Sequence, residues 1–384
     1  MTKRKAFYFL CIAFLVLLAA FPGRALVGAR SGLNAFLQNV LPALLPFYVG
    51  TSILVKSGMA SRITKYLSFL MKPLFGLPGE SAFAFFMAAI SGYPMGARLT
   101  AELYEAGRLT RPQAVGTAIL SSCCGPSFMV GAVAAGMLLS PSAGLIIACA
   151  HYLAMITIGI FYRPFLTLSP QPSRREPPKQ KKQEHPSLTG IVMDSIASSA
   201  VALWSVGSYL IFFSALISII NSFGILSTLG NVLAPAFRLL GISPNLAPAI
   251  LSGAIEMTGG CVDAASALAP LSSKVLACTF IITFGGLSVA GQSLFYLRKT
   301  GVRLSTFLLA KLSGGILSVL FASILLSLVP LDVETTAPIL SFQQVMGANA
   351  TLLIAGVVFL SFIGAAMSLY NMRNQRKKPT KGKQ

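Results

Sequence analysis

Apolar runs long enough to cross a lipid bilayer constrain this chain more than any other feature. Six runs stand out: Phe7–Phe21, Phe36–Val55, Ala143–Tyr162, Ile196–Ile220, Phe307–Val329 and Leu352–Tyr370. Hydrophobic residues make up 55% of the 384 residues and charged residues only 10%, which is typical of integral membrane proteins. Since a helix of about 20 apolar residues spans the bilayer, the sequence predicts an all-α polytopic membrane protein with about eight to ten membrane segments.

The formal net charge of +20 comes from basic residues that gather beside the apolar runs. Half of the 30 lysines and arginines lie in three clusters: Lys3, Arg4 and Lys5; Arg163, Arg174, Arg175, Lys179, Lys181 and Lys182; and Arg373, Arg376, Lys377, Lys378, Lys381 and Lys383. Basic residues that flank spans stay on the cytoplasmic side, so we expect the N-terminus, the central linker and the C-terminus to be cytoplasmic. Topology and attraction to lipid headgroups explain the clusters better than nucleic-acid binding, so the expected partner is the bilayer and not a nucleic acid.

The central basic cluster lies in a segment that divides the chain into two halves. Between Arg163 and Pro186 the sequence is rich in proline and basic residues and has few large apolar side chains, so it cannot bury a core. We therefore expect six regions: residues 1–30, an N-terminal signal-anchor helix whose cleavage is left open; 31–162, a first repeat; 163–190, a linker; 191–312, a second repeat; 313–372, C-terminal membrane helices; and 373–384, a basic tail.

Glycine- and proline-rich stretches interrupt both halves at corresponding positions. They read "ISGYPMGA" and "SSCCGPSF" in the first half and "LSGAIEMTGG" and "FGGLSVAGQS" in the second. With the halves aligned, Ser91–Gly92 falls on Ser252–Gly253, and Gly125 falls on Gly286. Unwound backbone in a bilayer must face protein or a water-filled cavity, and paired interruptions point to a transporter's binding site. The alternative is that the glycines only permit close helix packing.

The same stretches carry a resemblance to a known family. "SGYPMGARLTAEL", "CCGPSFMVGAV", "GLIIACAHYL", "IEMTGG", "FGGLSVAGQ" and "TFLLAKL" resemble the YlbJ-type sporulation integral membrane proteins. That resemblance implies two nucleoside-recognition, or Gate, domains and a transporter at the outer forespore membrane that moves dipicolinic acid from the mother cell toward the spore. Two departures leave the substrate open: Cys123–Cys124 stands where the family often has a polar Asn-Ser pair, and Ala290 where it often has a histidine.

A small planar dianion would suit the N-termini of opposed half-helices, because free backbone N–H groups there bind anions without a metal. The candidate substrate-binding residues are Ser91, Gly92, Tyr93, Pro94, Arg98, Gly125, Pro126, Ser127, Glu256, Thr258, Gly259, Gly285, Gly286, Ser288 and Gln292. Arg98 would neutralise one carboxylate of the substrate, or it would be a surface charge on an amphipathic helix. Tyr93 would orient the substrate, or it would anchor the chain at the membrane interface.

Glu256 stands out because it lies in an otherwise apolar stretch, where a carboxylate is costly and often functional. One interpretation is that it binds and releases a proton during transport. The other is structural: Glu256 caps the helix that begins near Gly259, or it pairs with Lys274 or Lys311. For His151, in an apolar run, a packed and hydrogen-bonded role is favoured over a proton relay.

Several classes of function are excluded or disfavoured. The six cysteines show no metal or redox spacing, so we expect small buried side chains, no metal site and no cofactor. No Walker A, H-E-x-x-H or G-x-S-x-G sequence occurs, so no catalytic residue is assigned and an enzyme is not expected. Alternatives left open are a transporter of nucleosides or other small solutes, a Gate-domain scaffold that transports nothing, and an enzyme with Cys124 as nucleophile. A homo-oligomer or a sporulation membrane partner is also left open.

Overall fold

The computed structural model describes residues 3–57, 69–167, 187–239, 241–328 and residue 331, and within these ranges all regular structure is helical. The first half contains α1 (Lys3–Ala20), α2 (Pro22–Ala35), η1 (Phe36–Val40), α3 (Leu41–Lys56), η2 (Met71–Phe75), α5 (Glu80–Ser91), α6 (Met95–Glu105), α7 (Arg111–Leu120), η3 (Ser127–Met137) and α8 (Pro141–Thr167). The second contains α9 (Leu188–Ser222), α10 (Ile225–Leu239), η4 (Pro244–Leu246), α11 (Ala247–Ile255), α12 (Met257–Ser266), α13 (Leu271–Phe284), α14 (Gly286–Leu297) and α15 (Leu304–Leu328). The all-α prediction is confirmed.

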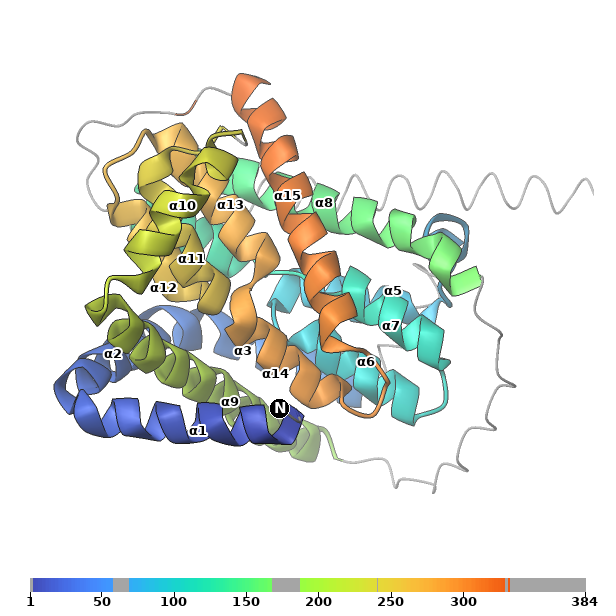
Figure 1. The fold of residues 1–384 in the computed structure, drawn as a ribbon. Coiled ribbons are helices and arrows are strands. Elements are labelled where there is room, and N and C mark those ends of the chain that lie inside the picture. The colour runs from blue at the N-terminus through green and yellow to red at the C-terminus, as the bar shows by residue number, and fades with distance from the viewer. Residues whose placement is uncertain (1–2, 58–68, 168–186, 240, 329–330, 332–384) are drawn as a thin grey trace, which may run out of the picture.

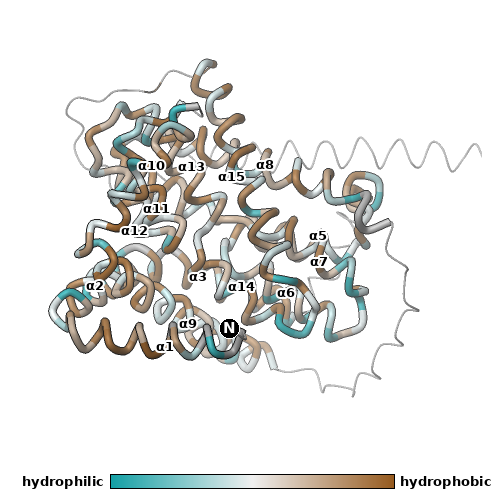
Figure 2. The backbone as a smooth tube through the Cα atoms, in the orientation of Figure 1, coloured by the Kyte–Doolittle hydropathy of each residue, from teal (hydrophilic) through white to brown (hydrophobic). Residues whose placement is uncertain are grey.

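Four helical stretches in the described residues are long and apolar enough to cross a membrane. They are Pro141–Arg163, Leu188–Ser222, Leu271–Leu297 and Leu304–Leu328. The first, second and fourth match runs expected from the sequence, whereas Leu352–Tyr370 and the basic tail lie outside the described residues. Figure 2 shows mainly hydrophobic residues along α1, α9 and α15 and hydrophilic ones around α6. The chain is therefore an integral membrane protein with several spans.

The N-terminal region differs from the single signal-anchor helix expected over residues 1–30. Cys11–Ala20 and Pro22–Gln38 meet at an angle of 100°, so together they form either one broken span or a re-entrant loop. Proline and glycine at the start of α2 disfavour continuation of α1, and α2 continues past residue 30 and packs along α9. A Cβ on Gly32 would lie 2.8 Å from the Ser214 hydroxyl oxygen, so a small residue is needed for this close approach.

The structure also differs from the sequence prediction at the run Phe36–Val55 and at the domain boundary expected after residue 312. The run is not one uniform helix, because η1 is a π-helical segment that leads into α3, with Pro46 inside α3. The boundary between residues 312 and 313 falls inside α15, which continues to Leu328. Apolar composition predicted these segments as helical, but composition carries no signal for where the helical geometry changes.

All four glycine-rich stretches are helix interruptions in the structure. The first separates α5 from α6 at Gly92, and the second separates α7 from η3 between Leu120 and Ser127. The third is the single extended residue Glu256 between α11 and α12, and the fourth is Gly285 between α13 and α14. Gly92 and Gly285 have φ of 82° and 79°, values that glycine adopts without strain.

Within each half, one interruption packs directly on the other. A Cβ on Gly92 would lie 2.8 Å from the amide nitrogen of Gly125, and a Cβ on Gly286 would lie 2.7 Å from the carbonyl oxygen of Gly253. Both distances are too short for a side-chain carbon, so the backbones of the two interruptions touch. The glycines are thus required for packing, and the same packing brings the ends of broken helices together.

The second-half helices α13, α14 and α15 lie between α5–α7 of the first half and α10–α12 of the second (Figure 1). Helix α15 packs on both α8 and α13, while α14 packs on α6 and α9. The largest buried hydrophobic cluster draws on both halves, including Phe128, Ile147, Ile250 and Ile281. The halves therefore share one core, and all four interruptions lie near their junction.

Replacement of Gly96 tests the close packing of the first-half interruptions. A Cβ at Gly96 would overlap the carbonyl oxygen of Ser121, whereas a Cβ at Gly50, which is also helical, meets no atom within 4 Å. We expect Gly96→Ala to cost about 1–3 kcal/mol through overpacking. Gly50→Ala should be neutral or stabilising by up to about 1 kcal/mol. Thermal unfolding in detergent, followed with a thiol-reactive dye, measures both, and equal melting temperatures would contradict the packing described.

Candidate functional site

A cavity opens at the junction of the two halves and is bordered by residues of, or next to, all four interruptions. Its lining comprises Val40, Leu44, Gly92, Tyr93, Cys124, Gly125, Phe128, Val206, Leu210, Glu256, Met257, Thr258, Ser288, Val289 and Gln292. The cavity volume is about 40 Å³, room for a few water molecules, and the cavity is partly open to the surroundings. Like the solute-binding cavities of other proteins, it combines an apolar lining with a few polar groups.

Glu256 is the acidic residue of this lining, and only 3% of its surface is exposed. Its carboxylate accepts hydrogen bonds from the amides of Thr258, at 2.9 Å, and Gly259, at 2.6 Å. Glu256 therefore caps the N-terminus of α12, as the structural alternative from the sequence proposed. Pairing with lysine is not found in the described residues, because Lys274 donates to the carbonyl of Ala265 and Lys311 to other groups.

This cap corrects one expectation about the anion site. The first amides of α12 were expected to be free for a bound anion, but the Glu256 carboxylate already occupies those of Thr258 and Gly259. No lysine or arginine belongs to the cavity lining formed by the described residues. The cavity therefore presents a carboxylate, and no fixed positive side chain, to a bound molecule.

Ser288 and Gln292 add polar groups one helical turn apart on α14. The Ser288 hydroxyl is fully buried and has no hydrogen-bond partner among the described residues. Gln292 is 6% exposed, and both residues line the cavity. A buried hydroxyl without a partner costs free energy unless a water or a bound molecule satisfies it, so these two side chains are available for binding.

The structure brings together seven of the fifteen candidate residues in the cavity lining: Gly92, Tyr93, Gly125, Glu256, Thr258, Ser288 and Gln292. The other eight, Ser91, Pro94, Arg98, Pro126, Ser127, Gly259, Gly285 and Gly286, are not part of that lining. Among these, the hydroxyl of Ser91 lies 2.7 Å from that of Thr51, which ties α5 to α3. Sequence analysis missed the apolar lining from α3, η1 and α9, since apolar residues carry no signal that distinguishes lining from core.

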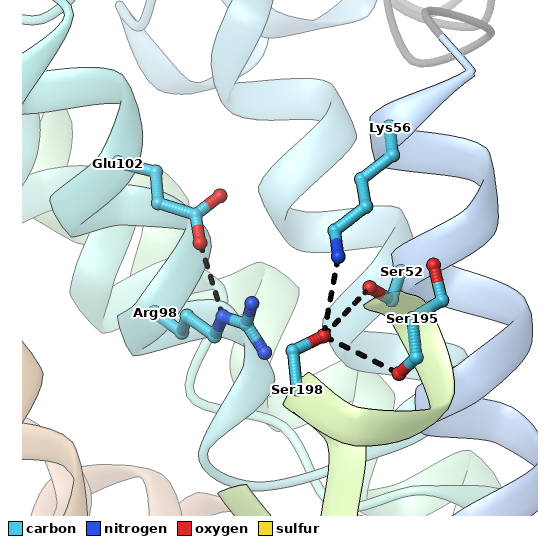
Figure 3. A network of polar contacts seen from close by, with 6 residues as sticks. All are labelled: Ser52, Lys56, Arg98, Glu102, Ser195 and Ser198. Atoms are coloured by element: carbon cyan, nitrogen blue, oxygen red, sulfur yellow. Dashed lines mark hydrogen bonds and ion pairs between the residues drawn. The ribbon is translucent and has the colours of Figure 1, made fainter. Parts of the chain in front are cut away.

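Arg98, expected to neutralise a substrate carboxylate, instead pairs within its own helix. Its Nε donates to Glu102 at 3.0 Å, one turn further along α6 (Figure 3). A neighbouring cluster joins α3 to α9, where the Ser198 hydroxyl lies 3.3 Å from that of Ser52 and 3.5 Å from Nζ of Lys56 (Figure 3). Arg98 is thus engaged on a polar surface, as its alternative interpretation proposed.

His151 links the second interruption to the second half. Its Nε2 accepts a hydrogen bond from the amide of Cys124 at 2.9 Å, and its Nδ1 lies 2.9 Å from the Thr283 hydroxyl. Since Nε2 accepts, Nδ1 carries the proton and donates to Thr283. The neutral, fully buried ring agrees with the packed role favoured from the sequence.

Three further polar side chains satisfy backbone groups at the interruptions. The Tyr48 hydroxyl donates to the carbonyl of Tyr93 at 2.9 Å, and the Tyr152 hydroxyl lies 3.0 Å from the carbonyl of Cys124. Lys311, considered above only as a partner for Glu256, is 2% exposed and donates to the Ser122 carbonyl at 3.2 Å as well as to the Tyr93 hydroxyl. A buried lysine within an apolar run was the available signal in the sequence for this contact.

Replacement of His151 tests the link between the two halves. His151→Leu leaves the Cys124 amide and the Thr283 hydroxyl without their partner, and each buried unpaired group should cost about 1–3 kcal/mol. His151→Gln, whose side-chain oxygen can replace Nε2, should recover part of the loss. Thr157→Val is the control, since that exposed hydroxyl bonds only to Leu153 in the same helix. A His151→Leu protein that unfolds at the control's temperature would contradict this role.

Comparison with known families and proteins adds independent findings. A family model described as Nucleoside recognition, named Gate, matches residues 37–141 and 203–303. The chain is also 29% identical, over 318 residues, to the sporulation integral membrane protein YlbJ of Bacillus subtilis strain 168. That match covers 79% of this chain and 78% of the relative.

Solved structures share the fold at low sequence identity. A double variant of CNTnw in an outward-facing state superposes with a TM-score of 0.59 at 14% identity, over 86% of both chains. CNTnw in an inward-facing, substrate-bound state superposes with a TM-score of 0.54 at 15% identity, over 80% of this chain and 85% of that one. At this level of identity the comparison establishes the fold alone.

Proposed function

Because this chain belongs to the nucleoside-recognition (Gate) family, we propose that it is a membrane transporter that carries a small polar solute through the cavity between its halves. The observation that carries the proposal is the cavity itself, which lies where four broken helices meet and is lined by polar groups on α12 and α14. Irregular backbone at membrane depth is typical of transporter binding sites. The shared fold with CNTnw, solved in outward-facing and inward-facing states, supports the same function.

Dipicolinic acid is the first candidate solute. The similarity to a sporulation integral membrane protein over 79% of this chain supports a role in spore formation. In that role the protein would reside in the outer forespore membrane, with its N-terminus, linker and C-terminus on the cytoplasmic side, and would move a small anion from the mother cell toward the forespore. Binding and translocation require no catalytic residue and no cofactor.

A nucleoside or similar neutral solute is the second candidate, and the charge of the cavity favours it. Glu256 places a carboxylate in a lining to which the described residues contribute no lysine or arginine. Two like charges in a site of low dielectric repel each other strongly, so a dianion would have to enter together with protons or a cation. A solute that carries hydroxyl or amine donors would instead bond to Glu256, Ser288 and Gln292.

Uptake into proteoliposomes tests the proposal and discriminates between the solutes. Labelled dipicolinate and a labelled nucleoside are supplied separately to liposomes with the purified protein and to empty liposomes. Val206→Trp fills the cavity from α9, while Val201→Trp changes the same helix at a residue that is 73% exposed. We expect Val206→Trp to reduce uptake at least about tenfold and Val201→Trp to leave it unchanged, since only the former narrows the cavity.

The same measurements can also contradict the proposed transport path. Equal uptake by both would place the path elsewhere, and no uptake of either solute by folded wild-type protein would favour the scaffold that transports nothing.

The effect of Glu256→Gln differs in sign for the two solutes. For a neutral solute that donates to the carboxylate, losing a charged hydrogen bond worth about 1.5–3 kcal/mol should lower kcat/KM about tenfold or more. For a dianion, the removal of the repelling charge should leave uptake unchanged or increase it. Asp263→Asn, an exposed carboxylate on the same helix and outside the cavity lining, is the control. A nucleoside whose uptake is unaffected by Glu256→Gln would count against the second candidate.

A further inference from the structure

Lys311 on α15 places a buried amino group at the junction of the two halves. Only 2% of its surface is exposed, and no carboxylate of the described residues lies within 4.0 Å of its Nζ. The Nζ atom donates to the Tyr93 hydroxyl at 2.5 Å and to the Ser122 carbonyl at 3.2 Å, and it lies 4.3 Å from the centre of the Tyr93 ring. Burial of a charge within a membrane span is expensive and usually functional.

The hydrogen-bond partners of this amino group come from two of the four interruptions, and its side chain packs along a third. Tyr93 belongs to the α5–α6 interruption and Ser122 to the one between α7 and η3. A Cβ on Gly285, at the α13–α14 interruption, would lie 3.5 Å from Cε of Lys311, so the lysine side chain passes along that backbone. The Tyr93 hydroxyl in turn donates to the carbonyl of Ile282 at 3.1 Å, in the last turn of α13.

The groups around Nζ are those that bind a small monovalent cation. Carbonyl groups just beyond the C-terminal end of a helix carry partial negative charge, and in transporters the unwound carbonyls of broken helices hold the coupling ion. An aromatic face attracts the same charge. The Ser122 hydroxyl is also buried and has no hydrogen-bond partner among the described residues, so a further oxygen is available beside its carbonyl.

We propose that Lys311 is a tethered cation, which occupies the position of a coupling ion and holds the interruptions of both halves together without bound Na⁺. This inference deepens the proposed transport function, since it concerns how the same site is assembled. Lys311 acts as a positioning residue: it fixes Tyr93, which lines the cavity, and does not itself belong to the cavity lining. The proposal makes transport independent of Na⁺ and makes the site dependent on a positive charge at Nζ.

The first experiment measures thermal unfolding, which does not depend on any transported solute. Wild type, Lys311→Ala and Lys274→Met are compared in chloride salts of Na⁺, choline and methylammonium at equal ionic strength. Lys274 is the matched control because its Nζ donates to the Ala265 carbonyl away from the cavity lining. For wild type, and likewise for Lys274→Met, we expect the unfolding temperature to be the same in all three salts.

We expect Lys311→Ala to unfold at a lower temperature in choline and to gain about 3 °C or more in Na⁺ or methylammonium, because a small cation can bind the vacated oxygens. A Lys311→Ala protein that responds to neither cation would overturn the proposal, since the lysine would then serve packing alone. A wild-type protein that is stabilised by Na⁺ relative to choline would also overturn it, and this arm stands even if the variant fails to fold.

The second experiment measures uptake by wild-type proteoliposomes with Na⁺ or choline on both sides and with an inward Na⁺ gradient. We expect the same rate in all three conditions, and a rate that rises severalfold with Na⁺ would overturn the tethered cation. Failure of the transport function itself is distinguishable, since it abolishes uptake in every salt and leaves the unfolding comparison intact.

Discussion

The structure depends on one constraint: backbone groups at membrane depth must find hydrogen-bond partners within the protein. Four helical runs are interrupted inside the molecule, and each interruption leaves amides or carbonyls without a partner in the same helix. Glycine lets the interrupted backbones touch, as Gly92 does with Gly125 and Gly286 with Gly253. Polar side chains then complete the pairing, with His151 on the Cys124 amide and Glu256 on the Thr258 amide.

The same constraint separates two buried charges that sequence analysis considered as a pair. Glu256 caps α12 and faces the cavity, whereas Lys311 reaches across the interruptions to Tyr93 and the Ser122 carbonyl. Glu256 accepts hydrogen bonds from amides at the start of a helix, where the helix dipole is positive. Lys311 donates to a carbonyl just after the end of a helix, where the dipole is negative. The cavity therefore carries an acidic side chain, while Lys311 supports the wall behind Tyr93.

Sequence alone predicted the features that follow from strong local signals. The apolar runs gave α8, α9 and α15, and glycine and proline located the four interruptions, because no other residues tolerate those backbone conformations so readily. Six cysteines were expected to be buried: Cys123, Cys124, Cys261 and Cys278 are, whereas Cys149 is half-buried and Cys11 is exposed. Composition predicts that such a residue lies in an apolar helix, but it does not predict which face of the helix the residue occupies.

Features that depend on contacts distant in the chain could not be predicted. The link between Lys311 and Tyr93 joins residues 218 positions apart, and nothing local distinguishes it from a pair with Glu256. Sequence analysis placed Arg98 near the substrate because of its position after Pro94. In the structure Arg98 pairs with Glu102, which lies one turn away on the same helix, where such ion pairs form readily. Half of the cavity lining is apolar and indistinguishable in sequence from core.

The central claim, that the cavity is the solute path, is tested most directly by the chemical accessibility of Ser288. Ser288→Cys is introduced into a Cys11→Ala background, where the exposed native thiol is absent, and its rate of alkylation is measured with and without the transported solute. The account predicts that the new thiol reacts and that the solute slows the reaction severalfold, while Leu309→Cys on the outer face of α15 is unaffected. A thiol at position 288 that reacts at the same rate with and without every transported solute would contradict the account.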